Sequence, residues 1–234
     1  MVTIYPYSAL GHANHGWLDA RHHFSFAGYR NPQRLGFGRL LVINDDTIAA
    51  GRGFASHPHD NMEIITYVRA GAITHQDSLG NKGRTAAGDV QVMSAGTGVR
   101  HSEFNHETIA TTLYQIWIEP NRVNVEPRWE AREFPKEVIS HGGLPILVSG
   151  QEQHVGQGAL FIYQDAAIYG GKLVAGASIN QVIKHQAYIL ASLGSITING
   201  NTLQQGDGAE ITDTKNVTIK AEGDAEILLI DVPQ

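Results

Sequence analysis

Short runs of apolar and β-branched residues recur along the whole chain, separated by glycine, asparagine or aspartate. Several of these runs alternate apolar and polar residues with a period of two, which is typical of β-strands that bury one face. No segment keeps a helical period for more than two turns. The pattern predicts an all-β protein, with strands over 39–44, 63–69, 72–75, 89–93, 112–118, 159–163, 171–174, 187–193, 195–199, 208–212, 217–221 and 225–232.

A stretch rich in proline and glycine interrupts this pattern at residues 135–145. It follows the charged segment 128–133, which we expect to be solvated. Proline and glycine are the strongest local markers of loops and boundaries. We therefore predict two domains, at residues 1–135 and 143–234.

The two halves resemble each other around glycine residues. Gly71-Ala-Ile-Thr in the first half matches Gly194-Ser-Ile-Thr in the second, and each glycine ends a strand-like run. Further along, Gly88-Asp-Val matches Gly206-Asp-Gly. Two copies of one β-unit are the simplest interpretation.

Composition excludes several classes of protein. With no cysteine, the chain cannot have a disulfide framework, thiolate catalysis or cysteine-ligated zinc and iron–sulfur sites. A net charge of −6 and the lack of any lysine or arginine run argue against nucleic-acid binding. Neither a signal-peptide pattern nor an apolar stretch of about 20 residues that could span a membrane is present. We expect a cytoplasmic protein.

The histidines are concentrated in the first half, where nine of the 12 lie at or before His106. His57 and His59 precede a strand-like run, and His101 and Glu103 follow a glycine-rich loop with the same spacing of two residues. Side chains two residues apart on a strand point to the same side. On neighbouring strands, these pairs would bring three imidazoles and one carboxylate together.

Such a donor set suits one divalent transition metal ion, and iron, manganese, nickel, copper and zinc all fit it. Four protein ligands leave up to two open positions on an octahedral ion, as a catalytic metal requires. We expect Glu63 to lie outside the ligand set, because it is one step further along the chain than residues 57, 59 and 61, which would share a face. The same expectation holds for the remaining histidines of this half: His12, His15, His22, His23, His75 and His106.

The second half lacks this donor set. An alignment without gaps from the matched glycines places Asn180 and Val182 opposite His57 and His59, and Ile219 and Ala221 opposite His101 and Glu103. None of the four can replace its counterpart as an ordinary metal ligand. We therefore predict that the C-terminal domain is a degenerate, metal-free copy.

These motifs resemble the cupin superfamily and, more narrowly, the pirin family. The similarity covers nearly the whole chain, and it is most specific in WLDARHHFSF, HPHDNMEIITYV, HQDSLGN and MSAGTGVRHSE. It implies a bicupin of two tandem jelly-roll-like β-barrels. It also implies one metal ion, expected to be Fe(II), in the N-terminal domain only, held by His57, His59, His101 and Glu103.

Some pirins show quercetin 2,3-dioxygenase activity. The resemblance thus implies cleavage of a flavonol-like substrate by O₂ with release of CO, and Glu103, the only carboxylate in the expected ligand set, is the candidate catalytic base. Eukaryotic pirins are nuclear regulators, so the alternative is a non-enzymatic metal- or redox-sensing protein that binds a protein partner. An isomerase or sugar-binding cupin would fit the fold but not the pirin resemblance. Because pirins bury their two copies against each other, we expect a monomer.

Overall fold

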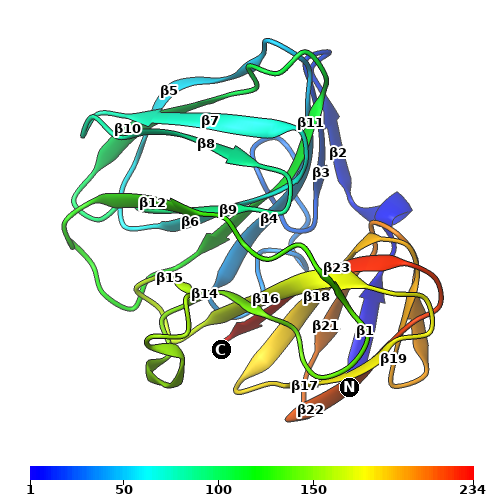
Figure 1. The fold of residues 1–234 in the computed structure, drawn as a ribbon. Coiled ribbons are helices and arrows are strands. Elements are labelled where there is room, and N and C mark those ends of the chain that lie inside the picture. The colour runs from blue at the N-terminus through cyan, green and yellow to red at the C-terminus, as the bar shows by residue number, and fades with distance from the viewer. The chain divides into compact units, whose positions relative to one another are not determined.

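The computed structural model describes all residues 1–234, and its regular structure is almost entirely β-strand (Figure 1). The helical elements are two 3₁₀ turns, η1 (Tyr7–Ala9) and η2 (Glu152–His154), so the predicted all-β class is confirmed. No helix is long and apolar enough to cross a membrane. The chain forms two compact units. The N-terminal unit comprises Gly11–Pro135 with Leu160–Gln164, and the C-terminal unit comprises Met1–Leu10, Lys136–Ala159 and Asp165–Gln234.

The N-terminal unit has a larger and a smaller antiparallel sheet. The larger sheet has the strand order β12-β9-β6-β11-β4-β3-β2, and the smaller has the order β5-β10-β7-β8. Apolar side chains from both sheets pack together, as when Ile73 of the smaller sheet meets Val68 and Leu113 of the larger. The strands are β2 (Gly11–Asn14), β3 (Leu18–His22), β4 (Leu40–Ile48), β5 (Gly53–His59), β6 (Glu63–Ala70), β7 (Ala72–Asp77), β8 (Lys82–Ala86), β9 (Val90–Ser94), β10 (Val99–Phe104), β11 (Thr111–Ile118), β12 (Arg128–Arg132) and β15 (Leu160–Phe161).

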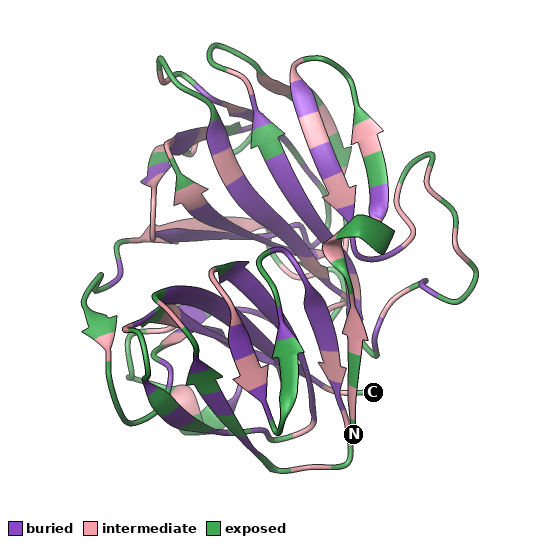
Figure 2. Ribbon diagram, turned by 90° about the vertical axis from the view of Figure 1, so that its right-hand side faces the viewer, coloured by how far each residue is buried: buried purple, intermediate pink, exposed green.

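The C-terminal unit is also built from two sheets around an apolar interior. One sheet runs β1-β21-β18-β23-β16-β14, with β13 beside β16, and the other runs β17-β22-β19-β20. Strands β18 and β23 are buried over nearly their whole length, whereas β17 and β22 alternate buried and exposed residues (Figure 2). The strands are β1 (Val2–Tyr5), β13 (Val138–Ile139), β14 (Ile146–Ser149), β16 (Ala167–Leu173), β17 (Ser178–Val182), β18 (Gln186–Leu193), β19 (Ile196–Ile198), β20 (Asn201–Leu203), β21 (Gly208–Ile211), β22 (Asn216–Ala221) and β23 (Ala225–Val232).

The two units repeat one topology. The order β5-β10-β7-β8 corresponds to β17-β22-β19-β20, and β9-β6-β11-β4 corresponds to β21-β18-β23-β16. Gly71 and Gly194 occupy equivalent turns with φ of 73° and 71°. A Cβ atom at Gly194 would lie 2.3 Å from the Asp224 carbonyl oxygen, so close approach and positive φ both require glycine there. The internal repeat inferred from the sequence is confirmed.

Two details of the sequence interpretation differ from the structure. Residues 1–10 belong to the C-terminal unit, because β1 pairs with β21. The segment 128–133, expected to be solvated, contains strand β12, which pairs with β9. Its charges lie along one side, where Glu130 forms ion pairs with Arg128 and Arg132, while Trp129 packs against the apolar cluster of Ile64 and Met93.

The ungapped alignment of the two halves is also wrong by one residue in β17. Asn180 and Val182 are exposed, and the buried residues of that strand are Ile179 and Gln181. Ile179 pairs with Ile219, just as His57 pairs with His101. One extra residue in the second copy explains the error, because a shift of one position moves every side chain of a strand to the other face.

Candidate metal centre

The predicted ligand pairs lie on adjacent antiparallel strands of the smaller sheet. His57 and His59 are on β5, His101 and Glu103 are on β10, and His57 is the direct cross-strand partner of His101. The pairing shifts register between His101 and Glu103. Imidazole nitrogens of His57, His59 and His101 all lie within 4.8 Å of one another. The structure thus brings the three predicted histidines together.

The ring orientations of His57 and His101 match those of adjacent metal ligands. Nδ1 of His57 lies 2.8 Å from the carbonyl oxygen of Ala55. A carbonyl oxygen can only accept, so Nδ1 carries the proton and Nε2 keeps its lone pair. That Nε2 lies 3.1 Å from Nε2 of His101. Two ligands about 2.1 Å from an ion and at right angles would be about 3.0 Å apart, so the spacing fits a shared metal ion.

Burial keeps the imidazoles of His59 and His101 in the neutral form that a metal requires. It lowers the pKa of His101 to about 3, with further lowering by the neighbouring His57 and His75. It also lowers the pKa of His59 to about 4, an effect that His101 and His57 reinforce. The His59 ring is held edge-on to Trp117, with the ring centroids 5.0 Å apart. Near neutral pH both rings therefore offer a lone pair.

A buried chain of hydrogen bonds leads away from His101. Its Nδ1 lies 3.4 Å from Nδ1 of His75, and Nε2 of His75 lies 3.1 Å from a carboxylate oxygen of Asp77. Burial alone would raise the pKa of Asp77, but hydrogen bonds from Asn81 and His75 hold it below its ordinary value. The anionic Asp77 therefore accepts from His75, which in turn accepts from Nδ1–H of His101. This chain leaves Nε2 of His101 free to bind a metal.

Glu103 is held by three neutral donors from the larger sheet. Nε2 of Gln91 and Oγ1 of Thr66 donate to its Oε1 at 2.6 and 3.2 Å. Nε2 of Gln115 donates to its Oε2 at 3.0 Å. These donors were not predicted from the sequence, although each is a single polar residue at an inward position of an apolar strand. That exception to the hydrophobic pattern is a signal by which they could have been found.

His75 was expected from the sequence to lie outside the ligand set. It groups with His101 and Glu103, whose candidate ligand atoms also lie within 4.8 Å of one another. Both of its ring nitrogens already face partners, however, and it stacks at 7° on the ring of Trp129. His75 is fully buried and does not line the cavity described below. Its geometry is that of a residue that orients His101.

The other acidic and histidine residues lie outside the cluster. Glu63 is buried on β6, where it accepts a hydrogen bond of 2.8 Å from Ser94, and burial raises its pKa to about 7. It belongs to neither group of candidate ligands. His12 pairs with Asp19, and His106 stacks on Phe104. These residues have partners that do not involve a metal.

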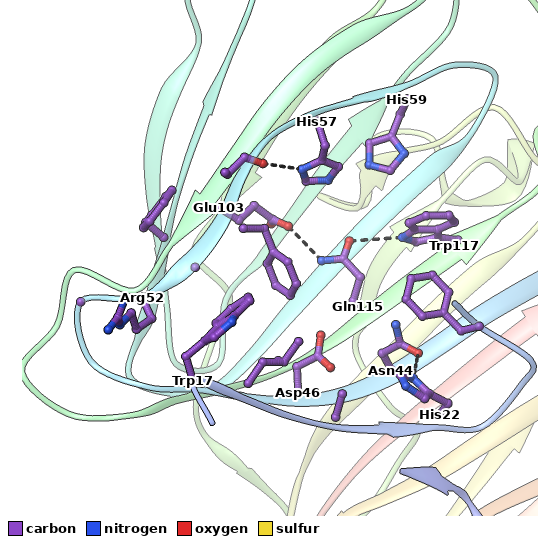
Figure 3. Close-up of a pocket in the computed structure, with 18 residues that line it drawn as sticks. Trp17, His22, Asn44, Asp46, Arg52, His57, His59, Glu103, Gln115 and Trp117 are labelled. Atoms are coloured by element: carbon purple, nitrogen blue, oxygen red, sulfur yellow. Dashed lines mark hydrogen bonds between the residues drawn. The ribbon is translucent and has the colours of Figure 1, made fainter. Parts of the chain in front are cut away.

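A cavity of about 730 Å³ opens beside the histidines (Figure 3). His57, His59 and Glu103 form part of its wall. Most of the remaining wall is apolar, with five aromatic side chains, and such a wall favours a flat apolar ligand. The aromatic residues of the wall are Trp17, Phe26, Phe54, Phe104 and Trp117.

Comparisons with known proteins agree with this architecture. The family model Pirin matches residues 5–118, and the model of the quercetinase C-terminal cupin domain matches residues 146–232. The chain is 52% identical to "Putative quercetin 2,3-dioxygenase PA1210" of Pseudomonas aeruginosa, over 99% of this chain and 100% of that protein. It is 43% identical to a protein of Escherichia coli K12 named quercetin 2,3-dioxygenase, over 100% of this chain and 99% of that protein.

The structure is similar to that of the bacterial pirin YhhW of Escherichia coli, solved in complex with nickel(II). The TM-score is 0.91 and the identity 43%, over 100% of this chain and 99% of the other. The likeness extends over both units, so the predicted bicupin fold is confirmed. Each unit is an open pair of sheets of the kind that cupins form.

Proposed function

The chain belongs to the pirin family, and we propose that it is a metal-dependent dioxygenase that cleaves a flavonol-like substrate with O₂ and releases CO. The proposed ligands are His57, His59, His101 and Glu103. The observation that carries the proposal is the pair of Nε2 atoms of His57 and His101, 3.1 Å apart beside a cavity with aromatic walls. Relatives named quercetin 2,3-dioxygenase support the substrate class.

The donor set fits one divalent transition metal ion per chain. Three neutral imidazoles and one carboxylate suit iron, manganese, nickel, copper or zinc, and we propose Fe(II). The nickel(II) complex of the Escherichia coli pirin supports a divalent metal in this family. When bound, the metal supplies Lewis-acid activation of a substrate hydroxyl and access to O₂ chemistry.

The residues of this chain orient the substrate, exclude water from the cavity and accept a proton. Trp17 and Phe54, edge-on with ring centroids 5.3 Å apart, and Trp117 form flat walls that orient an aromatic ring and exclude water. Glu103 is 3% exposed and lines the cavity. It is the proposed base, because it is the only carboxylate of the ligand set and is held rigidly by its three donors. Its carboxylate would receive the proton of the substrate hydroxyl.

The two domains divide this work unequally in the proposal. The N-terminal domain holds the metal and the substrate. In the C-terminal domain, the positions equivalent to His57 and His101 are Ile179 and Ile219, which are both buried and apolar. We therefore propose that the C-terminal domain is a metal-free structural partner.

The test is CO release and O₂ uptake with quercetin, on protein loaded anaerobically with Fe(II). The matched variants are His101→Ala, which removes a proposed ligand, and His141→Ala, which removes an exposed histidine of the C-terminal unit. CO that depends on the metal, is lost in His101→Ala and persists in His141→Ala would support the dioxygenase. Stoichiometric iron without CO would favour the alternative, a metal- or redox-sensing regulator with a protein partner.

A further inference from the structure

A row of polar side chains crosses the inner face of the larger sheet. Five residues on adjacent strands β3, β4, β11, β6 and β9 are direct cross-strand partners. Inner faces of sheets are normally apolar, and polar groups placed there require hydrogen-bond partners. In order, the members of the row are His22, Asn44, Gln115, Thr66 and Gln91.

The two ends of this row serve different partners. Gln115, Thr66 and Gln91 donate to the carboxylate of Glu103, as described above. Nδ1 of His22 lies 2.8 Å from Oδ1 of Asn44, and both residues line the cavity. The second end of the row therefore faces the space that the substrate would occupy, beyond the metal centre.

Asp46 lies next to the end of the row that is formed by His22 and Asn44. It is two residues from Asn44 on β4, so its side chain is on the same face, and Figure 3 shows it directed into the cavity below Gln115. The residue is 3% exposed, and its Oδ1 is buried without a hydrogen-bond partner. Burial, with the nearby charges of Asp45 and Glu103, raises the pKa of Asp46 to about 8.

A buried polar side chain with an unpartnered atom is costly, so the place of Asp46 in the cavity wall points to a ligand that hydrogen-bonds to this carboxyl group. A carboxyl group can donate and accept when protonated, and it accepts when ionised. A phenolic hydroxyl matches either state, because it is both donor and acceptor. Asn44, two residues away on β4, also lines the cavity and offers an amide as a second hydrogen-bonding group.

We infer that Asp46, with Asn44 and His22 beside it, forms a second polar subsite that binds a ring hydroxyl of the aromatic substrate away from the metal centre. The inference rests on the proposed function, in that it takes the ligand of the cavity to be a hydroxylated aromatic compound. Its consequence is selectivity for substrates that carry hydroxyl groups besides the one that reaches the metal. A site built to bond a hydroxyl discriminates strongly against an analogue that lacks it.

The test compares two ligands by quenching of tryptophan fluorescence, since Trp17 and Trp117 line the cavity. Quercetin is titrated against 3-hydroxyflavone, which keeps the 3-hydroxyl group but lacks the others. The protein is loaded with nickel(II) and kept free of O₂, so that binding is measured without turnover. The variants are Asp46→Ala and Asp46→Asn, and the control is Asp19→Asn, a half-exposed carboxylate on the neighbouring strand β3.

The wild type is expected to bind quercetin at least about tenfold more tightly than 3-hydroxyflavone. Asp46→Ala should weaken quercetin binding about tenfold and leave 3-hydroxyflavone within about twofold, which also shows that the variant is folded. Asp46→Asn keeps the shape and one hydrogen-bonding oxygen, so its loss for quercetin should be smaller. Asp19→Asn should bind both ligands like the wild type.

Equal weakening of both ligands by Asp46→Ala, or no weakening of either, would overturn the inference. The outcome is separable from that of the proposed function. If the variant loses quercetin binding selectively and the protein releases no CO, the subsite is supported and the proposed dioxygenase activity is rejected. CO release in a protein whose Asp46 variants bind both ligands like the wild type would overturn the subsite alone.

Discussion

The two units share a strand order but differ in what they place on the inner face of the larger sheet. Four members of the polar row in the N-terminal unit have apolar or aromatic counterparts at the same register positions in the C-terminal unit. Those counterparts all belong to the apolar core of that unit. The replacements are Asn44 by Tyr169, Gln115 by Leu229, Thr66 by Ile189 and Gln91 by Ala209.

The same contrast holds on the smaller sheet, where His57 opposite His101 becomes Ile179 opposite Ile219. The C-terminal unit shows that this topology also closes around an interior in which these positions are apolar. The fold therefore does not need the polar row, which satisfies its hydrogen bonds at the cost of apolar burial. The difference between the units separates the residues that build the fold from those that build the site.

The largest effect is expected from Glu103→Gln. The amide keeps the shape of the side chain and one oxygen ligand, but it cannot accept the substrate's proton. Metal content should stay near one ion per chain, while CO release from quercetin should fall about 10²- to 10⁴-fold. Metal analysis and turnover on the same preparation check this, and full activity in the variant would remove Glu103 from the role of base.

His75→Gln should weaken metal binding without removing a proposed ligand. His75 connects His101 to the anionic Asp77, and residues that orient a ligand in this way contribute about 10- to 100-fold to metal affinity. A competition titration with a chelator measures the effect. His141→Gln, an exposed histidine of the C-terminal unit, is the control, and unchanged affinity in His75→Gln would mean that the chain of hydrogen bonds does not position His101.

Asp46→Asn should change how stability depends on pH. The folded protein holds this carboxyl protonated up to about pH 8, whereas it ionises near 3.8 in the unfolded chain. The free energy of unfolding contributed by Asp46 is therefore fully present below about pH 4 and is lost as the pH rises to 8. The free energy of unfolding of the variant, measured in urea and compared with that of the wild type, should therefore rise by about 2 kcal/mol between pH 6 and pH 8. A constant difference across this range would contradict a protonated Asp46.

Much of this organisation could be predicted from the sequence because it depends on local pattern. Glycine spacing marked the repeat, since Gly71 and Gly194 both need positive φ. The spacing of His57 and His59, and of His101 and Glu103, placed each pair on one side of a strand. The rest depends on contacts between residues far apart in the chain. No local pattern joins β1 to β21, or brings Asp77 and His75 behind His101.

The polar row could be predicted only in part from the sequence. Each member is visible as a polar residue in an apolar strand, but the register that aligns Asn44, Gln115 and Thr66 across three strands appears only in the structure. The need for the observed strand pairing also explains the one-residue error in the alignment of β17. An ungapped alignment cannot detect one extra residue, and the period of two then converts a small error into the wrong face of the strand.

The smallest effect is expected where one site residue is replaced by its counterpart from the other unit. Gln115→Leu introduces the residue found at position 229 and removes the donor to Oε2 of Glu103, together with the acceptor for the Trp117 indole. Turnover should fall about tenfold, because losing a hydrogen bond from a neutral donor to a charged acceptor costs about 1.5 kcal/mol or more. Stability in urea should be kept, because leucine fits this place in the C-terminal sheet. A variant that loses stability but keeps turnover would show that the polar row supports the fold of the N-terminal unit, and the contrast between the units would then concern folding rather than chemistry.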